Sequence, residues 1–201
     1  MHEKQNMSLI SRLFVNKQRF QGKKIILRPL YKKEISLITL WFSNYKLLEL
    51  GFGILRETPN FTAITTSYLK HLTTNRDQFF AIEAPEVGFI GFISHHIVDY
   101  QEGVGRIGIL IGNQSAWGKG YGRDAVSTAL WYLFIEKGLS KVELDTAEFN
   151  KHAQHCFEAC GFIIDEKKTE TQKDENQPRR IWYEINRLAF IEQHRANFDI
   201  K

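Results

Sequence analysis

The sequence predicts an α/β fold in which a mixed, largely antiparallel central sheet carries helices on both faces. Two observations support this fold class. Segments with helical spacing come early, a run of strands follows, and the chain then alternates strand, helix, strand, helix, strand, strand. A chain of 201 residues, 43% of them hydrophobic, is also long enough to bury one substantial core. We therefore expect a single domain over residues 21–201, preceded by an N-terminal arm over residues 1–20.

The first half of the chain is predicted to contain two clear helices and three strands. Proline cannot donate a hydrogen bond to a neighbouring strand, so Pro29 stops the first strand. Residues 44–53 show no clear period. The N-terminal arm, residues 1–20, could be a turn of helix, a docked segment or disordered chain. The expected elements are strand 24–30, helix 32–44, helix 62–74, strand 78–83 and strand 86–98.

The second half alternates strands with helices more regularly. Gly161 follows the second of these helices at the position where a left-handed residue often ends a helix. Residues 168–179 are almost wholly polar, and we expect a solvated loop there. The expected elements are strand 104–112, helix 124–137, strand 141–146, helix 150–160, a hairpin that begins over 162–168, strand 180–186 and helix 187–194.

A glycine-rich turn, residues 114–123, joins a strand to the N-terminus of a helix. Glycines at alternate positions let the backbone approach a ligand closely and adopt dihedral angles that other residues avoid. The first amides of a helix have no partners within it, and the helix dipole adds roughly half a positive charge there. A lysine and an arginine add full charges, so the turn predicts a phosphate or pyrophosphate site. These residues are Gly118, Lys119, Gly120, Gly122 and Arg123.

The glycine spacing excludes two common phosphate-binding motifs. A P-loop needs Gly-Lys-Ser/Thr four residues after a glycine, and the turn has no such sequence. A dinucleotide-binding turn needs GxGxxG, whereas residues 118–122 read GxGxG. No acidic residue stands suitably at the end of a second strand either. The turn therefore predicts a different phosphate-bearing ligand.

The composition indicates an ordinary soluble protein of the cytoplasm. The net charge of +4 suits an anionic ligand and is too small to indicate nucleic-acid binding. No apolar run is long enough to span a membrane, and the N-terminus lacks the apolar core of a secretion signal. Cys156 and Cys160 lie four residues apart on a predicted helix, where core packing is expected rather than a disulfide or a zinc site. We therefore expect no metal and a reducing compartment.

Several segments around the glycine turn carry a resemblance to a known family. They are Ile-Gly-Ile-Leu-Ile-Gly at 107–112, Trp-Gly-Lys-Gly-Tyr-Gly at 117–122, Asp-Ala at 124–125, Gly-Leu-Ser-Lys-Val at 138–142, Asn150, and Phe-Glu-Ala-Cys-Gly-Phe at 157–162. In these segments the chain resembles the GNAT superfamily of acyl-CoA-dependent N-acetyltransferases. It looks most like the branch named for the ribosomal-protein N-terminal acetyltransferases. The resemblance covers residues 23–190, and its specific part is residues 105–165.

The resemblance implies the GNAT fold and acetyl-CoA as the cofactor. The strand around Leu110 would offer backbone groups to the pantetheine arm and an amide to the thioester carbonyl, where a fixed donor stabilises developing negative charge. Asn150 would cap its helix and bond the pantetheine arm. Gly108 would mark either a bulge where the sheet splays or a tightly packed position. The implied cofactor-binding residues are Ile109, Leu110, Ile111, Trp117, Gly118, Lys119, Gly120, Tyr121, Gly122, Arg123, Asn150 and Phe157.

Three positions depart from the catalytic pattern of the family. Arg106 stands where many relatives have an acidic residue, and Ala153 stands where many have serine. Phe157 stands where many relatives have the tyrosine that protonates the departing thiolate, and a phenylalanine cannot give a proton. No general acid is carried over, so the thiolate would leave unaided or take a proton from water.

Two histidines and three carboxylates are candidates for the base that takes the proton of the amine. Side chains alternate along a strand, so His95 and His96 must face opposite sides of the sheet. The ordinary pKa of histidine, near 6.5, suits proton transfer around neutral pH, although a strand histidine more often has a structural or surface role. The candidates are His95, His96, Asp99, Glu143 and Asp145, and His95, His96 and Asp145 are the expected catalytic residues.

The function expected from the sequence is direct transfer of acetyl from acetyl-CoA to a primary amine. A protein N-terminal α-amine is the acceptor that the branch implies. A small amine (a polyamine, an amino sugar or an aminoglycoside) is the alternative acceptor, and a CoA-binding module without catalysis is the alternative class. The expected partners are acetyl-CoA and the amine, without nucleic acid or membrane, in a monomer or a homodimer.

Overall fold

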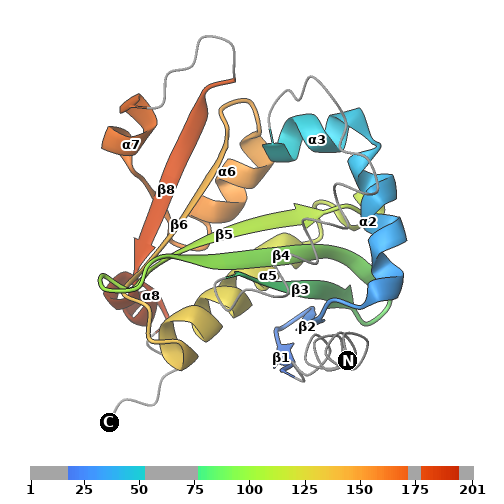
Figure 1. Cartoon of the computed structure of the whole chain (residues 1–201), viewed down its shortest axis with the longest axis horizontal. Helices are drawn as coiled ribbons and strands as arrows, with labels where there is room; N and C mark the ends of the chain where they lie inside the picture. Colours follow the sequence, from blue (N-terminus) through green and yellow to red (C-terminus); the bar gives the residue numbers. More distant parts are fainter. Residues whose placement is uncertain (1–17, 53–76, 172–177, 195–201) are drawn as a thin grey trace, which may run out of the picture.

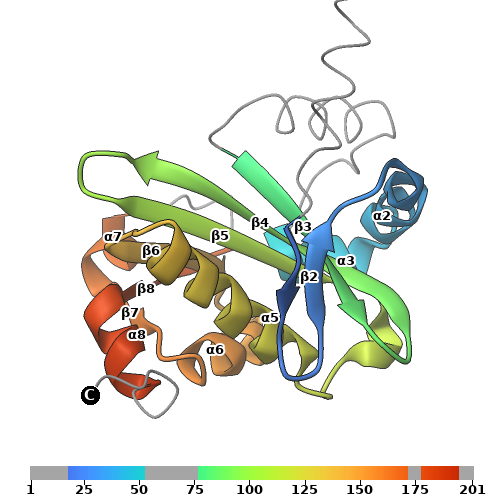
Figure 2. The same ribbon diagram turned by 90° about the horizontal axis from the view of Figure 1, so that it is seen from below.

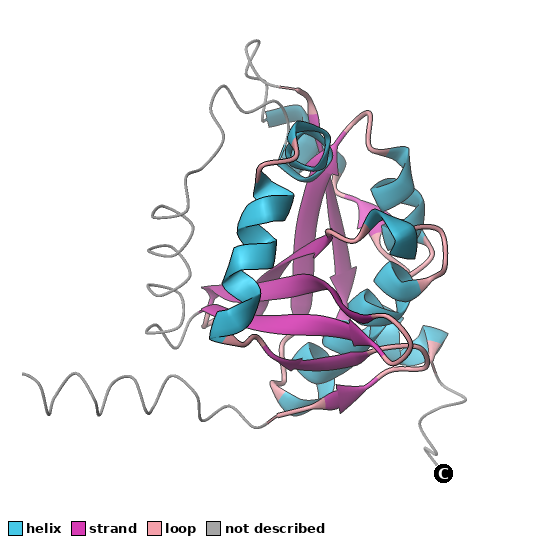
Figure 3. Ribbon diagram, turned by 90° about the vertical axis from the view of Figure 1, so that its right-hand side faces the viewer, coloured by secondary structure: helices cyan, strands magenta, loops and turns pink. Residues whose placement is uncertain are grey.

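The computed structural model describes residues 18–52, 77–171 and 178–194. These residues form an eight-stranded sheet in the order β1-β2-β3-β4-β5-β6-β8-β7. All neighbouring strands are antiparallel except β5 and β6, which run parallel. Helices lie on both sides of the strands (Figure 3), so the predicted mixed sheet with helices on both faces is confirmed.

The strands follow the predicted order with few differences in their bounds. They are β1 Phe20–Gln21, β2 Ile26–Pro29, β3 Asp77–Ala84, β4 Gly88–Asp99, β5 Val104–Ile111, β6 Lys141–Ala147, β7 Ile163–Ile164 and β8 Arg180–Asn186. Pro29 ends β2 as expected. The arm expected over residues 1–20 lies outside the described residues up to residue 17, and its last residue, Phe20, already belongs to β1.

The helices flank the sheet in two groups. They are η1 Lys32–Glu34, α2 Ile35–Phe42, α3 Tyr45–Phe52, η2 Gln114–Ala116, α5 Tyr121–Trp131, η3 Tyr132–Glu136, α6 Lys151–Glu158, α7 Glu166–Thr171 and α8 Arg187–Gln193. The helix expected over 62–74 lies outside the described residues. The residues without a clear period, 44–53, contain α3.

Each face of the sheet has its own apolar core. On one face, α5 packs Val126 and Leu130 against strand residues such as Phe80 and Ile93. Figure 2 shows α5 running across this face. On the other face, α2 packs Ile38 against Phe92, a neighbour of Ile93 in β4. The alternation of side chains along β4 therefore decides which residues face α5 and which face α2.

The structure corrects two predicted elements. The helix expected over 124–137 begins earlier, at Tyr121, and its last part is a π-helical turn, η3, that ends before Gly138. The loop expected over 168–179 is wrong at its start, because α7 occupies residues 166–171. Asp165 caps α7 by accepting the amide of Lys168 at 3.0 Å, and the buried Thr169 hydroxyl accepts the amide of Trp182 at 3.0 Å. The polar residues 166–171 form a helix here because the contact of Thr169 with β8 holds them against the sheet.

Candidate functional site

β5 and β6 pair only at their first residues, and this opens the sheet. Parallel pairing joins residues 104–106 to residues 141–143 and then stops. Beyond Arg106, β5 stays paired with β4 and β6 stays paired with β8, so β5 and β6 diverge (Figure 1). The opening holds a cavity of about 990 Å³. The predicted splay is therefore confirmed, but the bulge considered at Gly108 is wrong, because the β4–β5 register runs without a shift from residue 105 to residue 111.

The glycine turn lies at one end of this cavity. Gly118 and Gly120 have φ angles of +73° and +84°, which side chains disfavour, and Gly118 has open space where a Cβ would be. Gly122 differs, because it lies inside α5 and has no positive φ. The first backbone hydrogen bond of α5 joins the Asp124 amide to the Gly120 carbonyl. The amides of residues 121–123 therefore have no partner within the helix. This exposed helix start fits a pyrophosphate.

Three cationic side chains surround the turn, one of which the sequence did not indicate. Arg123 lines the cavity, and Lys119 is exposed. Lys24 is the unexpected residue: its Nζ donates to the Lys119 carbonyl at 3.0 Å. Its place depends on a contact about 100 residues away in sequence, so local pattern reading could not find it.

The strand that leads to the turn presents a free edge to the cavity. Over residues 107–111, β5 is paired with β4 on one side and with no strand of the described residues on the other. In an antiparallel pair, alternate residues direct both backbone groups away from the partner, so this edge offers donors and acceptors to a ligand. The Ile111 carbonyl is already engaged, because it accepts the Trp117 indole N–H at 2.8 Å. Ile109, Leu110 and Tyr121 also line the cavity.

Asn150 and Phe157 lie where α6 borders the cavity. Asn150 caps α6 as predicted, since its Oδ1 accepts the Ala153 amide at 3.2 Å, and its Nδ2 donates to the Leu50 carbonyl at 2.8 Å. It therefore ties α3 to α6, a role that the sequence did not indicate. Phe157 is buried against Phe162, with 6.1 Å between ring centroids.

The two strand histidines face opposite sides, as predicted. His96 lines the cavity. His95 lies outside the cavity lining and is buried on the α5 face, 6.1 Å from the Phe80 ring and 5.6 Å from the Tyr132 ring. Its Nε2 lies 3.3 Å from the Gln78 side-chain oxygen. The geometry thus separates the pair and leaves His96 as the strand histidine at the site.

The carboxylates expected as bases are engaged elsewhere. Asp145 lines the cavity, but its Oδ2 is 2.5 Å from the Arg180 Nε. Glu143 is buried between Lys168 and Lys141. Burial by itself would raise the pKa of Glu143, but the hydrogen bonds and charges of the two lysines outweigh it and lower the pKa. Asp99 lies in the turn between β4 and β5, where its Oδ1 accepts two backbone amides.

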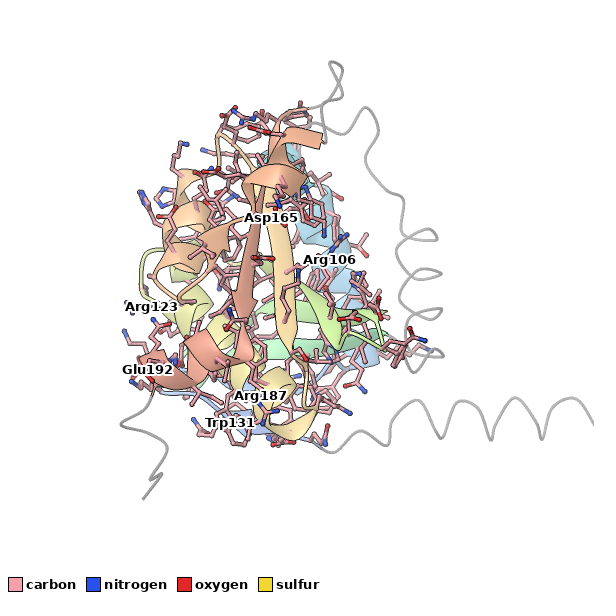
Figure 4. All side chains as sticks on the ribbon, turned by 90° about the vertical axis from the view of Figure 1, so that its left-hand side faces the viewer. Arg106, Arg123, Trp131, Asp165, Arg187 and Glu192 are labelled. Carbon is pink, nitrogen blue, oxygen red and sulfur yellow. The ribbon has the colours of Figure 1, made fainter. Side chains whose placement is uncertain are left out.

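Arg106 lies at the other end of the cavity from the glycine turn. It is five residues before Ile111 along β5, roughly 17 Å at the usual rise of a strand. Its guanidinium carbon is 4.3 Å from the centroid of the Trp182 ring. Figure 4 shows Arg106 well apart from Arg123, which belongs to the turn. The cavity therefore joins a phosphate-binding end to an end that carries His96, Arg106, Asp145 and Arg180.

Neither a metal site nor a membrane-crossing helix is found in the described parts of the chain. No group of three or more His, Cys, Asp or Glu side chains in residues 18–52, 77–171 and 178–194 is arranged to hold a metal ion. None of the helices described there is both long enough and apolar enough to cross a membrane.

Comparisons with known proteins agree with this geometry. A family model described as "Acetyltransferase (GNAT) domain" matches residues 24–163. A spermidine N(1)-acetyltransferase of Vibrio cholerae is 28% identical over 142 residues, which are 70% of this chain and 79% of the relative.

Solved structures show the same fold. The spermidine N-acetyltransferase of Vibrio cholerae in complex with CoA and spermine matches with a TM-score of 0.69 at 22% identity, over 85% of this chain and 99% of its own. An acetyltransferase of the GNAT family from Bacillus anthracis matches with a TM-score of 0.69 at 16% identity, over 85% and 99% of the two chains. These relatives do not single out the ribosomal-protein branch, so a protein N-terminus as acceptor stays a prediction.

Proposed function

The chain belongs to the GNAT acetyltransferase family, and on this premise we propose that it acetylates a small primary amine with His96 as the base. It is an acetyl-CoA-dependent N-acetyltransferase, and the finer proposal concerns its acceptor and its catalytic residue. The observation that carries the proposal is that one continuous cavity joins the glycine turn to His96.

The turn and the open edge of β5 bind and orient the cofactor. The Gly118–Gly120 backbone and the start of α5 supply donors for the pyrophosphate, with Lys24 and Arg123 adding charge. The outward-facing amides of residues 107–111 supply donors that are fixed before the reaction, so they need no reorganisation as negative charge develops. When bound, acetyl-CoA provides an activated acetyl group and a thiolate leaving group.

His96 takes the proton of the attacking amine. The amine nitrogen forms a bond to the acetyl carbon, the carbon–sulfur bond breaks, and the proton of the amine passes to the imidazole. His96 suits this role because it lines the cavity on the strand that pairs with Arg106, at the end away from the turn. Asp145 is held by Arg180, and Glu143 is held by two lysines, so neither competes for the proton.

Three side chains on α6 and β8 do not suit protonation of the departing sulfur. Phe157 has no hydroxyl, and burial raises the pKa of Tyr183 to about 12 while its hydroxyl donates to Glu158. Cys156 lines the cavity, but the hydrogen bond with Cys160 and burial raise the pKa of its thiol, which makes it a weaker acid than an ordinary thiol. We propose that the thiolate takes its proton from water.

A small acceptor is favoured over a protein N-terminus by two observations. Of the relatives named above, the two from Vibrio cholerae are spermidine acetyltransferases, one of them in complex with spermine, and both ligands are small amines. The cavity also continues between α2 and the sheet, where apolar side chains such as Ile38, Phe42 and Phe92 form its wall. A cavity with an apolar wall of this kind suits a small molecule.

The two histidines provide matched variants for the test. Thiol release from acetyl-CoA is measured with a panel of amines (an amino acid, an amino sugar, spermidine and a short peptide). His96→Gln should lower kcat by roughly 10²-fold or more and remove the rising limb that a histidine base gives to the pH–rate profile. His95→Gln should lower the melting temperature, because its ring packs between Phe80 and Tyr132, and should keep the rising limb.

Two results would decide against the proposal. If CoA binds but none of the amines is acetylated, the chain acts as a CoA-binding module without catalysis. If the peptide is acetylated with a much higher kcat/KM than the small amines, the acceptor is a protein N-terminus. Equal pH profiles for His96→Gln and the wild type would assign the base to another group.

A further inference from the structure

Four cationic and three acidic side chains lie at the end of the cavity away from the glycine turn, on the adjoining strands and on α7. The register of β5, β6 and β8 places Arg106 beside Glu143, Glu143 beside Glu184, and Asp145 beside Trp182, all on one face of the sheet. The cations are Arg106, Lys141, Lys168 and Arg180, and the carboxylates are Glu143, Asp145 and Glu184. Among the residues that the structure describes, this group therefore has one more positive charge than it has negative charges.

All three carboxylates already have cationic partners other than Arg106. Asp145 pairs with Arg180 at 2.5 Å, and Glu184 pairs with Lys141 at 3.0 Å. Glu143 binds Lys168 and, at 3.2 Å, Lys141. Across residues 18–52, 77–171 and 178–194, no ion pair to Arg106 is formed. The surplus charge therefore belongs to Arg106.

The surroundings of Arg106 leave part of its hydrogen-bonding capacity unused. Its Nε is buried and has no hydrogen-bond partner among the described residues. Its guanidinium lies over the Trp182 ring, at 4.3 Å from the centroid, so a flat apolar surface covers one side of it. The side chain also lines the cavity. A guanidinium placed in this way presents a planar set of donors that matches two oxygens of a carboxylate or a phosphate.

We propose that Arg106 binds an anionic group of the acceptor, so that the substrate is a primary amine that also carries a carboxylate or a phosphate. This inference rests on the proposed acetyltransferase function. A polycationic amine would bring like charge to Arg106, which disfavours it at this end of the cavity.

The positions of Arg106 and His96 place the anionic group and the amine of the acceptor on one face of the sheet. The two residues are direct partners in the β4–β5 ladder, and the Cβ atoms of such pairs are about 4.5–5.5 Å apart. The guanidinium lies over Trp182 of β8, on the side of β5 away from β4, so the amine and the anionic group of the acceptor are further apart than these Cβ atoms. Amino acids and amino phosphates carry both groups. The apolar wall near Phe42 and Phe92 accommodates a hydrophobic side group.

Matched acceptors test this inference. Phenylalanine is compared with phenylalaninamide, 2-aminoethyl phosphate with ethanolamine, and spermidine serves as the polycationic amine. In wild type, kcat/KM should be at least tenfold higher for the anionic member of one pair than for its neutral partner, and higher than for spermidine. Arg106→Gln should abolish that difference, and Arg106→Lys should retain part of it. Whichever pair shows the difference identifies the anionic group as carboxylate or phosphate.

A binding measurement provides a readout besides turnover. In the presence of CoA, calorimetry should detect N-acetylphenylalanine or N-acetylated aminoethyl phosphate binding to wild type and at least tenfold weaker binding to Arg106→Gln. CoA affinity itself should not change, which shows that the variant is folded. Arg187→Gln is the matched control, because Arg187 is exposed at the start of α8 and lies away from Arg106 (Figure 4).

The outcomes separate this inference from the proposed function. If spermidine is acetylated as efficiently as the anionic amines, with no effect of Arg106→Gln, the proposed function stands and the anionic acceptor is wrong. If no amine of the panel is acetylated while CoA binds, both are wrong. If Arg106→Gln and Arg187→Gln weaken product binding equally, the role of Arg106 is disproved.

Discussion

The carboxylate of Asp124 accepts the backbone amide of Lys24 at 2.6 Å, across 100 residues of sequence. Its two oxygens also accept the amides of Lys23 and Ile25, each at 3.1 Å. Asp124 lies in the first turn of α5, where a negative charge is favourable to the helix dipole. One side chain thus fixes the segment between β1 and β2 to the glycine turn and brings the Lys24 ammonium to it.

Asp124→Asn should both destabilise the protein and weaken CoA binding. Asparagine keeps one acceptor oxygen and presents an NH₂ group to backbone amides, so at least one amide loses its partner, at a cost of about 1–3 kcal/mol. Denaturant unfolding and calorimetry with CoA measure the two effects. Asp99→Asn is the matched control, because one oxygen of Asp99 accepts both of its amides and asparagine can replace it. Equal stability losses in the two variants would contradict the assigned role of Asp124.

Lys24→Gln should raise the Kd for CoA by about tenfold at low salt, which corresponds to ~1.4 kcal/mol. The ammonium is held at the Lys119 carbonyl, 3.5 Å from where a Cβ of Gly120 would lie, so its charge acts on a ligand of the turn. The difference should shrink as ionic strength rises. Lys23→Gln changes the neighbouring charge without this contact, and the idea fails if it weakens CoA equally.

Gly120→Ala should weaken CoA binding by more than its effect on folding explains. A left-handed φ of +84° costs an alanine about 1–2 kcal/mol, and the strained turn no longer presents the helix start correctly. Gly138→Ala provides the comparison, because Gly138 has a φ of +71° after η3 and lies outside the cavity lining. We expect similar losses of stability in both variants and a loss of CoA affinity in Gly120→Ala alone. Unchanged CoA affinity in Gly120→Ala would place the pyrophosphate elsewhere.

Stability should fall steeply above pH 10 because of two buried tyrosines. Burial raises the pKa of Tyr132 and of Tyr183 to about 12 each, from an ordinary value near 10. The unfolded chain loses these protons first, so the stabilisation is complete below pH 10 and is lost as pH rises through 12. For Tyr132 it amounts to about 2–3 kcal/mol. Tyr132→Phe should reduce the slope of unfolding free energy against pH by about half in this range, and an unchanged slope would contradict the assignment.

The local parts of the site were predictable from the sequence, because each follows from neighbouring residues. The positive φ angles of Gly118 and Gly120, the start of a helix after them and the cap at Asn150 all depend on a few adjacent positions. Alternation along β4 also predicted that His95 and His96 face opposite sides. The alternation alone could not predict which histidine faces the cavity, because that depends on which face of the sheet is covered by α5 and which by α2.

The electrostatics of the site were not predictable, because the partners come from distant elements. The sequence shows no partner for the carboxylate of Asp145, whereas in the structure it forms an ion pair with Arg180 of β8. Glu143 is held by Lys168, whose place depends on α7, an element that its polar composition concealed. In the sequence, Arg106 only marks a position where many relatives have an acidic residue. The ion pairs of its neighbours, seen in the structure, show that its charge is in surplus.

The short contact between β5 and β6 also divides the sheet into two modules that share one apolar core. The glycine turn and Lys24 belong to the module of β1–β5 and α5, whereas Asp145, Arg180 and Lys168 belong to the module of β6–β8 and α7. Only three residue pairs join the strands at the seam. Asp145 and Arg180 line the cavity from the second module, so substitutions there can change what is recognised while the glycine turn stays intact. Part of the acceptor preference can therefore evolve in this architecture while the pyrophosphate site stays constant.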